Sequence, residues 1–168
     1  MNLIRQNQSP TDPTKILIVD DEPGIRKVLE ITLSAAGYDI CQAGDGEQGL
    51  SAFTREAPDI VITDIKMPGI DGIQLLKKIK RLNRDTEVIM ITGHGDMALA
   101  VKSLKFEAAD FITKPIDSND LETAIQKAEE RINITRNIRH YMDDLETLVE
   151  EKDKKLHESE ALVTIGMT

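Results

Sequence analysis

The sequence predicts an α/β fold, in which a doubly wound, five-stranded parallel sheet is followed by one long C-terminal α-helix that forms a coiled coil. Short apolar runs alternate with amphipathic helical patterns over the first two thirds of the chain. These runs are nearly continuous rather than alternating, which is typical of strands buried on both faces of a sheet. Between Pro115 and Gly166 there is neither glycine nor proline, and no strand pattern interrupts the helical one.

Five apolar runs are expected as strands, at residues 15–20, 38–43, 58–63, 87–92 and 109–113. The intervals between and after them predict helices over about 23–36, 46–56, 72–82 and 96–106, and a fifth beginning near Asp117. Alternating strands and helices give a parallel sheet with helices on both faces. In such a sheet the functional site lies beyond the carboxyl ends of the strands.

The chain is expected to divide into three parts. Residues 1–14 lack the apolar core of a signal peptide and are predicted to be a disordered lead-in. Residues 15–135 form the globular domain, and residues 136–168 form a coiled-coil linker that starts a truncated output domain. Ser118 is the expected N-cap of the last helix, whose buried stripe is Leu121, Ile125, Ala128 and Ile132.

Further along, apolar side chains recur in alternating steps of four and three residues, as in a coiled-coil seam. Lys152 and Ser159 weaken the seam, which comprises Ile138, Met142, Leu145, Val149, Lys152, Leu156, Ser159 and Val163. A helix of about 45 residues is about 68 Å long, more than a small domain can cover. We therefore expect a parallel homodimer, with a single solvated helix as the alternative.

Composition excludes several classes of protein. The net charge of -9 opposes binding to nucleic acid or to an acidic membrane surface by general electrostatics. No run of about 18 apolar residues is present to span a bilayer. The single cysteine, Cys41, excludes an internal disulfide framework and fits the reducing cytoplasm, where we expect the protein to act.

Charged and polar side chains follow the predicted strands where each one ends. Asp20 and Asp21 follow the first strand, Asp64 the third, Thr92 the fourth and Lys114 the fifth. At one edge of a parallel sheet, two carboxylates 4 Å apart repel by about 4 kcal/mol, and Mg²⁺ relieves that repulsion. Solvated loop acids and helix caps are the alternative, but they do not explain the lysine and threonine. A carboxylate beside Mg²⁺ can attack phosphorus to give an acyl phosphate.

Four motifs in this arrangement resemble the receiver domain of two-component response regulators. They are LIVDDE (17–22), TDIKMPGIDG (63–72), ITG (91–93) and FITKP (111–115). The resemblance covers about residues 15–135 and implies the flavodoxin-like receiver fold. It also implies slow self-phosphorylation and dephosphorylation, with a histidine kinase or phosphotransfer protein as the phosphodonor.

The same resemblance assigns roles to individual residues. It implies that Asp64 is the phosphoacceptor and that Mg²⁺ is held by Asp20, Asp21, Asp64 and the backbone carbonyl of Lys66. Thr92 would hydrogen-bond the phosphoryl group and Lys114 would pair with it. Thr92 and Phe111 would form the switch, although Phe111 lacks the hydroxyl of the tyrosine found in many members. A cis peptide bond is expected before Pro115.

The output is open at this point. Residues 156–168 resemble the stretch before the phosphoacceptor-histidine helix of sensor histidine kinases, which implies a truncated receiver–histidine kinase hybrid. A cyclase, phosphatase or hydrolase output is one alternative, and a coil that itself serves as the dimerisation or partner-binding element is another. An independent phosphatase with an aspartate nucleophile is disfavoured, because it would need a D-x-D pair after the first strand.

Residues 44–49 also match the G-x-G-x-x-G pattern of dinucleotide-binding sites. The match follows the second strand rather than the first, and Asp45 and Glu47 would repel a pyrophosphate. A turn leading into a helix is the better interpretation.

Overall fold

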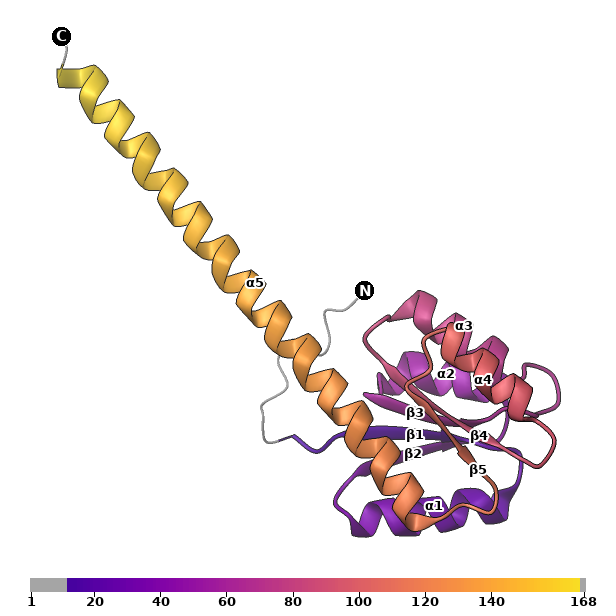
Figure 1. The fold of residues 1–168 in the computed structure, drawn as a ribbon. Helices are drawn as coiled ribbons and strands as arrows, with labels where there is room; N and C mark the ends of the chain where they lie inside the picture. Colours follow the sequence, from indigo (N-terminus) through magenta and orange to yellow (C-terminus); the bar gives the residue numbers. More distant parts are fainter. Residues whose placement is uncertain (1–11, 167–168) are drawn as a thin grey trace. The chain divides into compact units, whose positions relative to one another are not determined.

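The computed structural model describes residues 12–166, and the side chains of residues 12–159. Its five parallel strands lie in the order β2-β1-β3-β4-β5. The strands are β1 (Lys15–Val19), β2 (Asp39–Ala43), β3 (Ile60–Asp64), β4 (Glu87–Thr92) and β5 (Asp110–Thr113). The helices are α1 (Pro23–Ala35), α2 (Gly46–Glu56), α3 (Gly72–Leu82), α4 (Met97–Lys105) and α5 (Ser118–Gly166). The predicted α/β fold and long C-terminal helix are confirmed (Figure 1).

Alternating side chains on the central strands pack into two separate apolar clusters, one on each face of the sheet. On β1, Leu17 and Val19 belong to one apolar cluster, and Ile16 and Ile18 belong to the other. Residues from α2, α3 and α4 complete the first cluster, and residues from α1 and α5 complete the second. The sheet therefore lies between two layers of helices, which is why its central strands are apolar throughout (Figure 1).

The two edge strands are less buried than the sequence predicts. Asp39 and Gln42 on β2 and Thr113 on β5 are exposed, whereas every residue of β3 and β4 is buried. An edge strand has a neighbour on one side only, so the covering helices shield it less completely.

Aspartates begin several helices by accepting hydrogen bonds from free backbone N–H groups. Asp45 accepts from Gln48 N at 2.7 Å, and Asp71 accepts from Gln74 N at 2.8 Å. At α5 the predicted cap is wrong by one residue. Ser118 is the first helical residue, and the Asp117 carboxylate accepts from the backbone N–H of Asn119 at 2.7 Å.

The chain divides into two compact units, with the boundary between Ile132 and Asn133. In the first unit, the predicted stripe of α5 is buried in the core: Leu121, Ile125, Ala128 and Ile132, joined by Ala124. Residues 1–11, most of the predicted lead-in, lie outside the described part of the chain.

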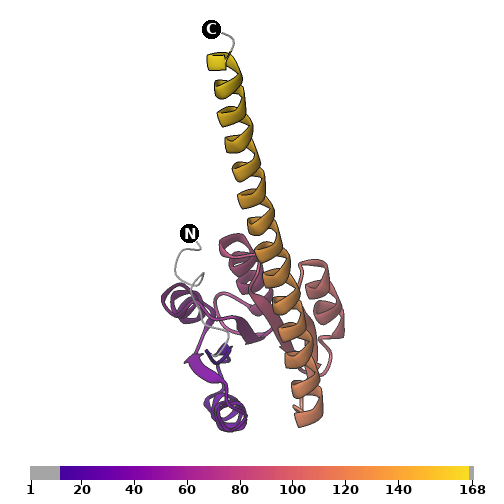
Figure 2. The same cartoon turned by 90° about the vertical axis from the view of Figure 1, so that its left-hand side faces the viewer.

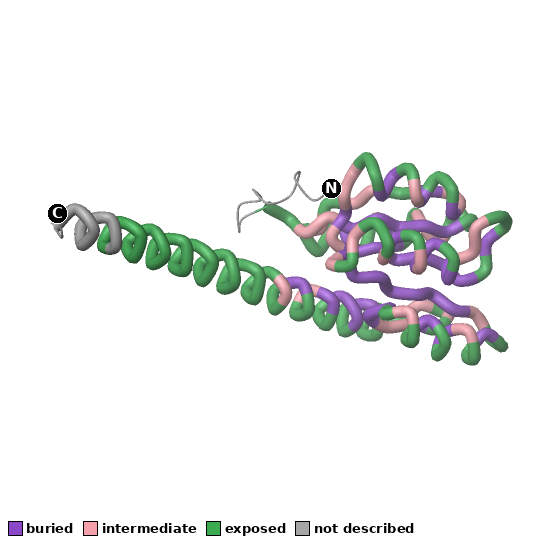
Figure 3. Tube along the Cα trace, turned by 90° about the horizontal axis from the view of Figure 1, so that it is seen from above, coloured by how far each residue is buried: buried purple, intermediate pink, exposed green. Residues whose placement is uncertain are grey.

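The second unit is helical from Asn133 to Gly166, and α5 runs through it without interruption (Figure 2). The apolar seam side chains described here are 43–61% exposed: Ile138, Met142, Leu145, Val149 and Leu156 (Figure 3). The Val163 side chain lies outside the described residues. No described helix has both the length and the apolar composition that crossing a bilayer requires.

Glycines in the 44–49 motif allow close packing. A Cβ at Gly46 would overlap the backbone carbonyl oxygen of Ile70 and lie 2.7 Å from the Ile70 Cβ. A Cβ at Gly49 would lie 3.0 Å from a methyl group of Val19. The motif therefore brings α2 against its neighbours.

Replacing Gly46 with alanine should destabilise the fold by about 1–3 kcal/mol, because the new methyl group meets backbone that cannot move aside. Gly24→Ala is the matched control, since nothing lies within 4 Å of a Cβ there. The free energy of unfolding in urea measures both effects. Equal stabilities of the two variants would contradict the close approach of Gly46 to Ile70.

Candidate functional site

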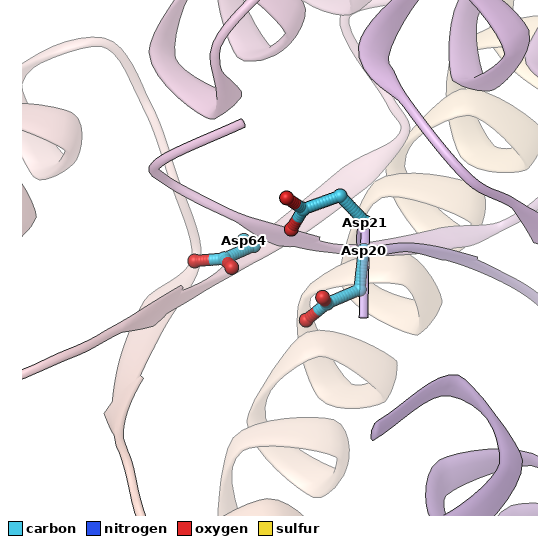
Figure 4. A group of neighbouring side chains, drawn as sticks. All are labelled: Asp20, Asp21 and Asp64. Atoms are coloured by element: carbon cyan, nitrogen blue, oxygen red, sulfur yellow. The ribbon is translucent and has the colours of Figure 1, made fainter. Parts of the chain in front are cut away.

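Three carboxylates converge at the carboxyl edge of the sheet. Asp20 and Asp21 follow β1, and Asp64 is the last residue of β3, the strand that pairs with β1. One carboxylate oxygen from each lies within 4.8 Å of the others (Figure 4). The structure therefore brings together the acids that the sequence places at separate strand ends.

Lys114 supplies a positive charge to this edge from the end of β5. Its Nζ donates to Asp64 Oδ2 at 3.0 Å and lies 3.5 Å from Glu22 Oε1 and 4.0 Å from Asp20 Oδ2. Partial burial lowers the pKa of this lysine, but the three carboxylates raise it by more. The pKa of Lys114 therefore lies above its ordinary value. The peptide bond from Lys114 to Pro115 is cis, as expected.

Asp20 is the most confined of the acids, with a fully buried side chain. The Glu22 backbone N–H donates to its Oδ1 at 2.8 Å, but its Oδ2 accepts no hydrogen bond from any described residue. Burial raises the pKa of Asp20 to about 6; the Glu22 hydrogen bond lowers it, and the neighbouring Asp64 raises it further. A buried carboxylate oxygen without a donor, facing two other carboxylates, fits a hard divalent cation such as Mg²⁺.

The remaining predicted residues lie on β4, on β5 and in the loop that follows β3. Thr92 is buried at the end of β4, and its hydroxyl donates to the Gly93 carbonyl at 3.3 Å. Phe111 on β5 is half-buried and packs against the core on the α2–α4 face of the sheet. Lys66, two residues after Asp64, forms an ion pair with Asp96 at 2.8 Å.

Sequence reasoning missed three residues that support the site. The Arg26 guanidinium donates to the Asp20 backbone carbonyl, and Asp96 holds the Lys66 ammonium. A Cβ at Gly72 would overlap the Asp64 carbonyl oxygen, so only glycine fits this close approach. Gly72 could have been found from its place in the I-D-G turn, but the Arg26 and Asp96 contacts join segments whose proximity only the fold creates.

The raised pKa of Asp20 predicts that stability falls as pH rises. The carboxyl group has an ordinary pKa of 3.8 and a folded-state pKa of about 6, so the folded chain binds the proton more tightly than the unfolded chain. In a chelating buffer, the free energy of unfolding should decrease from about pH 4 to about pH 7, and Asp20→Asn should remove about 3 kcal/mol of that decrease.

Urea unfolding at a series of pH values measures this effect, with Asp45→Asn as the control at a half-buried acid that caps α2. Added Mg²⁺ should flatten the profile of the original chain, because a bound cation favours the ionised carboxylate. Parallel profiles for Asp20→Asn and the original chain would show that Asp20 does not titrate as described.

Comparisons with known proteins agree with this geometry. The family profile of the response regulator receiver domain matches residues 16–126. The chain is 43% identical over 119 residues to the probable transcriptional regulator ycf27 of Guillardia theta, covering 71% of this chain and 46% of that protein. It is 39% identical over 113 residues to sporulation initiation phosphotransferase F of Bacillus subtilis, covering 67% of this chain and 91% of that protein.

Among solved structures, NtrX from Brucella abortus is 35% identical with a TM-score of 0.71, over 76% of this chain and 29% of that one. The chain thus spans less than half the length of the ycf27 protein and less than a third of NtrX. The match over residues 16–126 covers most of the chain, with the carboxylates and Lys114 inside it. The chain belongs to the response regulator receiver domain family.

Proposed function

We propose that the chain accepts a phosphoryl group on Asp64 in a Mg²⁺-dependent reaction, with a histidine kinase or phosphotransfer protein as donor. One observation carries the proposal. One carboxylate oxygen each from Asp20, Asp21 and Asp64 lies within 4.8 Å of the others, and the Lys114 ammonium lies 3.0 Å from Asp64. A nucleophilic carboxylate beside a cation site and an ammonium is the set that phosphoryl transfer requires.

In the proposed step, an Asp64 oxygen attacks the phosphorus of a phosphohistidine. The new P–O bond forms as the P–N bond breaks, and the donor imidazole nitrogen leaves with the electron pair. Lys114 stabilises the negative charge of the phosphoryl oxygens, and the Thr92 hydroxyl donates a hydrogen bond to one of them. Mg²⁺, when held by Asp20, Asp21, Asp64 and the Lys66 backbone carbonyl, supplies further positive charge for those oxygens.

A switch can follow from the movement of Thr92. If its hydroxyl turns from the Gly93 carbonyl toward the phosphoryl group, it vacates space beside β5. Phe111 is half-buried and can fill that space through ring burial alone, since it has no hydroxyl to form a new hydrogen bond. The face formed by α4, β5 and the start of α5 is the proposed readout.

The output beyond this domain has two candidates. The resemblance of residues 156–168 to the stretch before a kinase histidine helix favours a histidine kinase, although side chains from residue 160 onward lie outside the described part. The relative named as a probable transcriptional regulator favours an output that controls transcription. The expectation that nucleic acid plays no part therefore applies only to the residues described here. The gene's reading frame around these 168 residues distinguishes the candidates.

We also propose that the second half of α5 pairs with a second copy of the chain in a parallel coiled coil. Its exposed apolar side chains follow the four-and-three spacing of such a seam. The single cysteine, Cys41, supports action in the reducing cytoplasm.

Replacing Asp64 with asparagine should abolish labelling by phosphoramidate with Mg²⁺, because the amide nitrogen and oxygen do not form a stable acyl phosphate. Intact-mass spectrometry measures the label, and Asp45→Asn serves as the control because that residue only caps α2. Full labelling of the Asp64→Asn variant would refute the assignment of the phosphoacceptor.

Placing an acid in the proposed seam should weaken the dimer at least about tenfold, because Val149→Asp buries a charge between the two helices. Thr147→Asp is the matched control, since residue 147 lies about 200° from residue 149 around the helix. Sedimentation equilibrium measures the dissociation constants. A monomeric original chain, or equal dissociation constants for both variants, would contradict the proposed coiled coil.

A further inference from the structure

The aspartate at the start of α4 does not cap its helix. Asp96 occupies the N-cap position, but its side chain accepts no hydrogen bond from the first turn of α4. Asp45, Asp71 and Asp117 in the equivalent positions of α2, α3 and α5 each accept a backbone N–H at 2.7–2.8 Å. Asp96 therefore differs from the other three aspartates, because it occupies an N-cap position without capping its helix.

The backbone differs as well, since the ψ angle of Asp96 is 15°, whereas Asp45 and Asp71 have the extended ψ angles of 175° and 172°. With this backbone, the Asp96 carboxylate meets Lys66 instead. Its ammonium lies 2.8 Å from Asp96 Oδ1, and the Asp96 side chain is 11% exposed while that of Lys66 is 69% exposed. The carboxylate is thus drawn toward a lysine of the β3–α3 loop and away from the N–H groups of its own helix. An ion pair with so exposed a cation is weak and can be displaced by a stronger anion.

The phosphoryl group proposed on Asp64 is such an anion, and Lys66 lies close to Asp64 in the chain. It follows Asp64 by two residues, and an acyl phosphate on Asp64 would add negative charge and acceptor oxygens beside this loop. Lys114 already contacts three carboxylates of the site, so the new charge is not fully compensated by it. We therefore expect the phosphoryl group to compete with Asp96 for the Lys66 ammonium.

We propose that the Lys66–Asp96 ion pair is a latch that phosphorylation of Asp64 opens, releasing Asp96 to cap α4. This inference rests on the proposed function. In the unphosphorylated state Lys66 holds Asp96 and leaves the first turn of α4 uncapped. In the phosphorylated state Lys66 turns to the phosphoryl group, and Asp96 accepts the backbone N–H of Leu99, as Asp45 and Asp71 accept that of the third helical residue in α2 and α3.

The local structure permits this exchange and connects it to a surface. Capping requires the ψ angle of Asp96 to change from 15° to the extended region seen at Asp45 and Asp71. Gly95, directly before Asp96, has a φ of 89° and can accommodate such a change without steric cost. Lys66 and Leu99 both line one cleft of about 500 Å³, whose other walls include Ile65, Met67 and Ile73. The outer side of α4 exposes an apolar stripe of Met97, Val101 and Leu104. Capping would fix the first turn of α4 and with it the position of Met97 in that stripe.

The test measures the exchange of the Leu99 amide proton with water by NMR, in buffer containing Mg²⁺. Capping should slow this exchange about fivefold. In the original chain the exchange should slow after phosphoramidate is added, while intact-mass spectrometry records the phosphoryl group. In Lys66→Gln it should already be slow without phosphodonor, and in Asp96→Ala it should stay fast in both states. Lys102→Gln, in the last turn of α4, is the control for loss of a charge.

The outcomes separate the latch from the proposed function. An unchanged Leu99 exchange rate in Lys66→Gln, or in an original chain that carries the label, would overturn the latch. An unlabelled original chain would refute phosphorylation of Asp64. Slow exchange in Lys66→Gln would even then show that Lys66 holds Asp96 away from α4.

Discussion

The constraint on which this molecule depends is an excess of negative charge at one edge of its sheet. Asp20, Asp21, Glu22 and Asp64 gather there, and among the described residues Lys114 is the one cation that contacts their carboxylate groups. The parallel strands leave these acids no way to separate, because β1 and β3 are adjacent and end together. The cost is visible in Asp20, whose burial raises its pKa to about 6. A site with this imbalance favours ligands that bring positive charge, and it favours a cation before it can accept an anion.

At the opposite edge of the sheet, a buried acid has cations of the same chain beside it. Glu87, the first residue of β4, is also buried, and burial raises its pKa. Lys80 and Arg131 lower that pKa, and the Arg131 Nε lies 3.4 Å from the Glu87 carboxylate. There two cations offset part of the effect of burial, and the Arg131 contact joins α5 to β4, so the arrangement is structural. Charge that is compensated within the chain stabilises the fold, and charge that is left uncompensated creates the site.

Much of this arrangement could be predicted because it depends on local pattern. Continuous apolar runs identify buried parallel strands, and such strands place Asp20, Asp64 and Lys114 at a common edge whatever the details of packing. The same pattern could not reveal how incompletely the edge strand β2 is covered, since burial of an edge depends on neighbours that the strand's own residues do not encode. The sequence predicts Ser118 as the N-cap of α5, whereas the structure has Asp117 there; both residues are good caps, and only backbone geometry distinguishes them.

Asp96 shows why the remaining contacts lie beyond sequence reasoning. From its position before an apolar helical stretch it would be assigned as a cap, as Asp45 and Asp71 are. Its carboxylate instead meets Lys66, which is 30 positions away in the chain and comes close only because β3 and β4 pair in parallel. A local preference and a contact created by the fold thus compete for one side chain. The two interactions are of comparable, small free energy, about 1 kcal/mol each, so a new charge nearby is enough to decide between them. Because Lys66 lies two residues after the acceptor Asp64, this competition allows a single added phosphoryl group to change the start of α4.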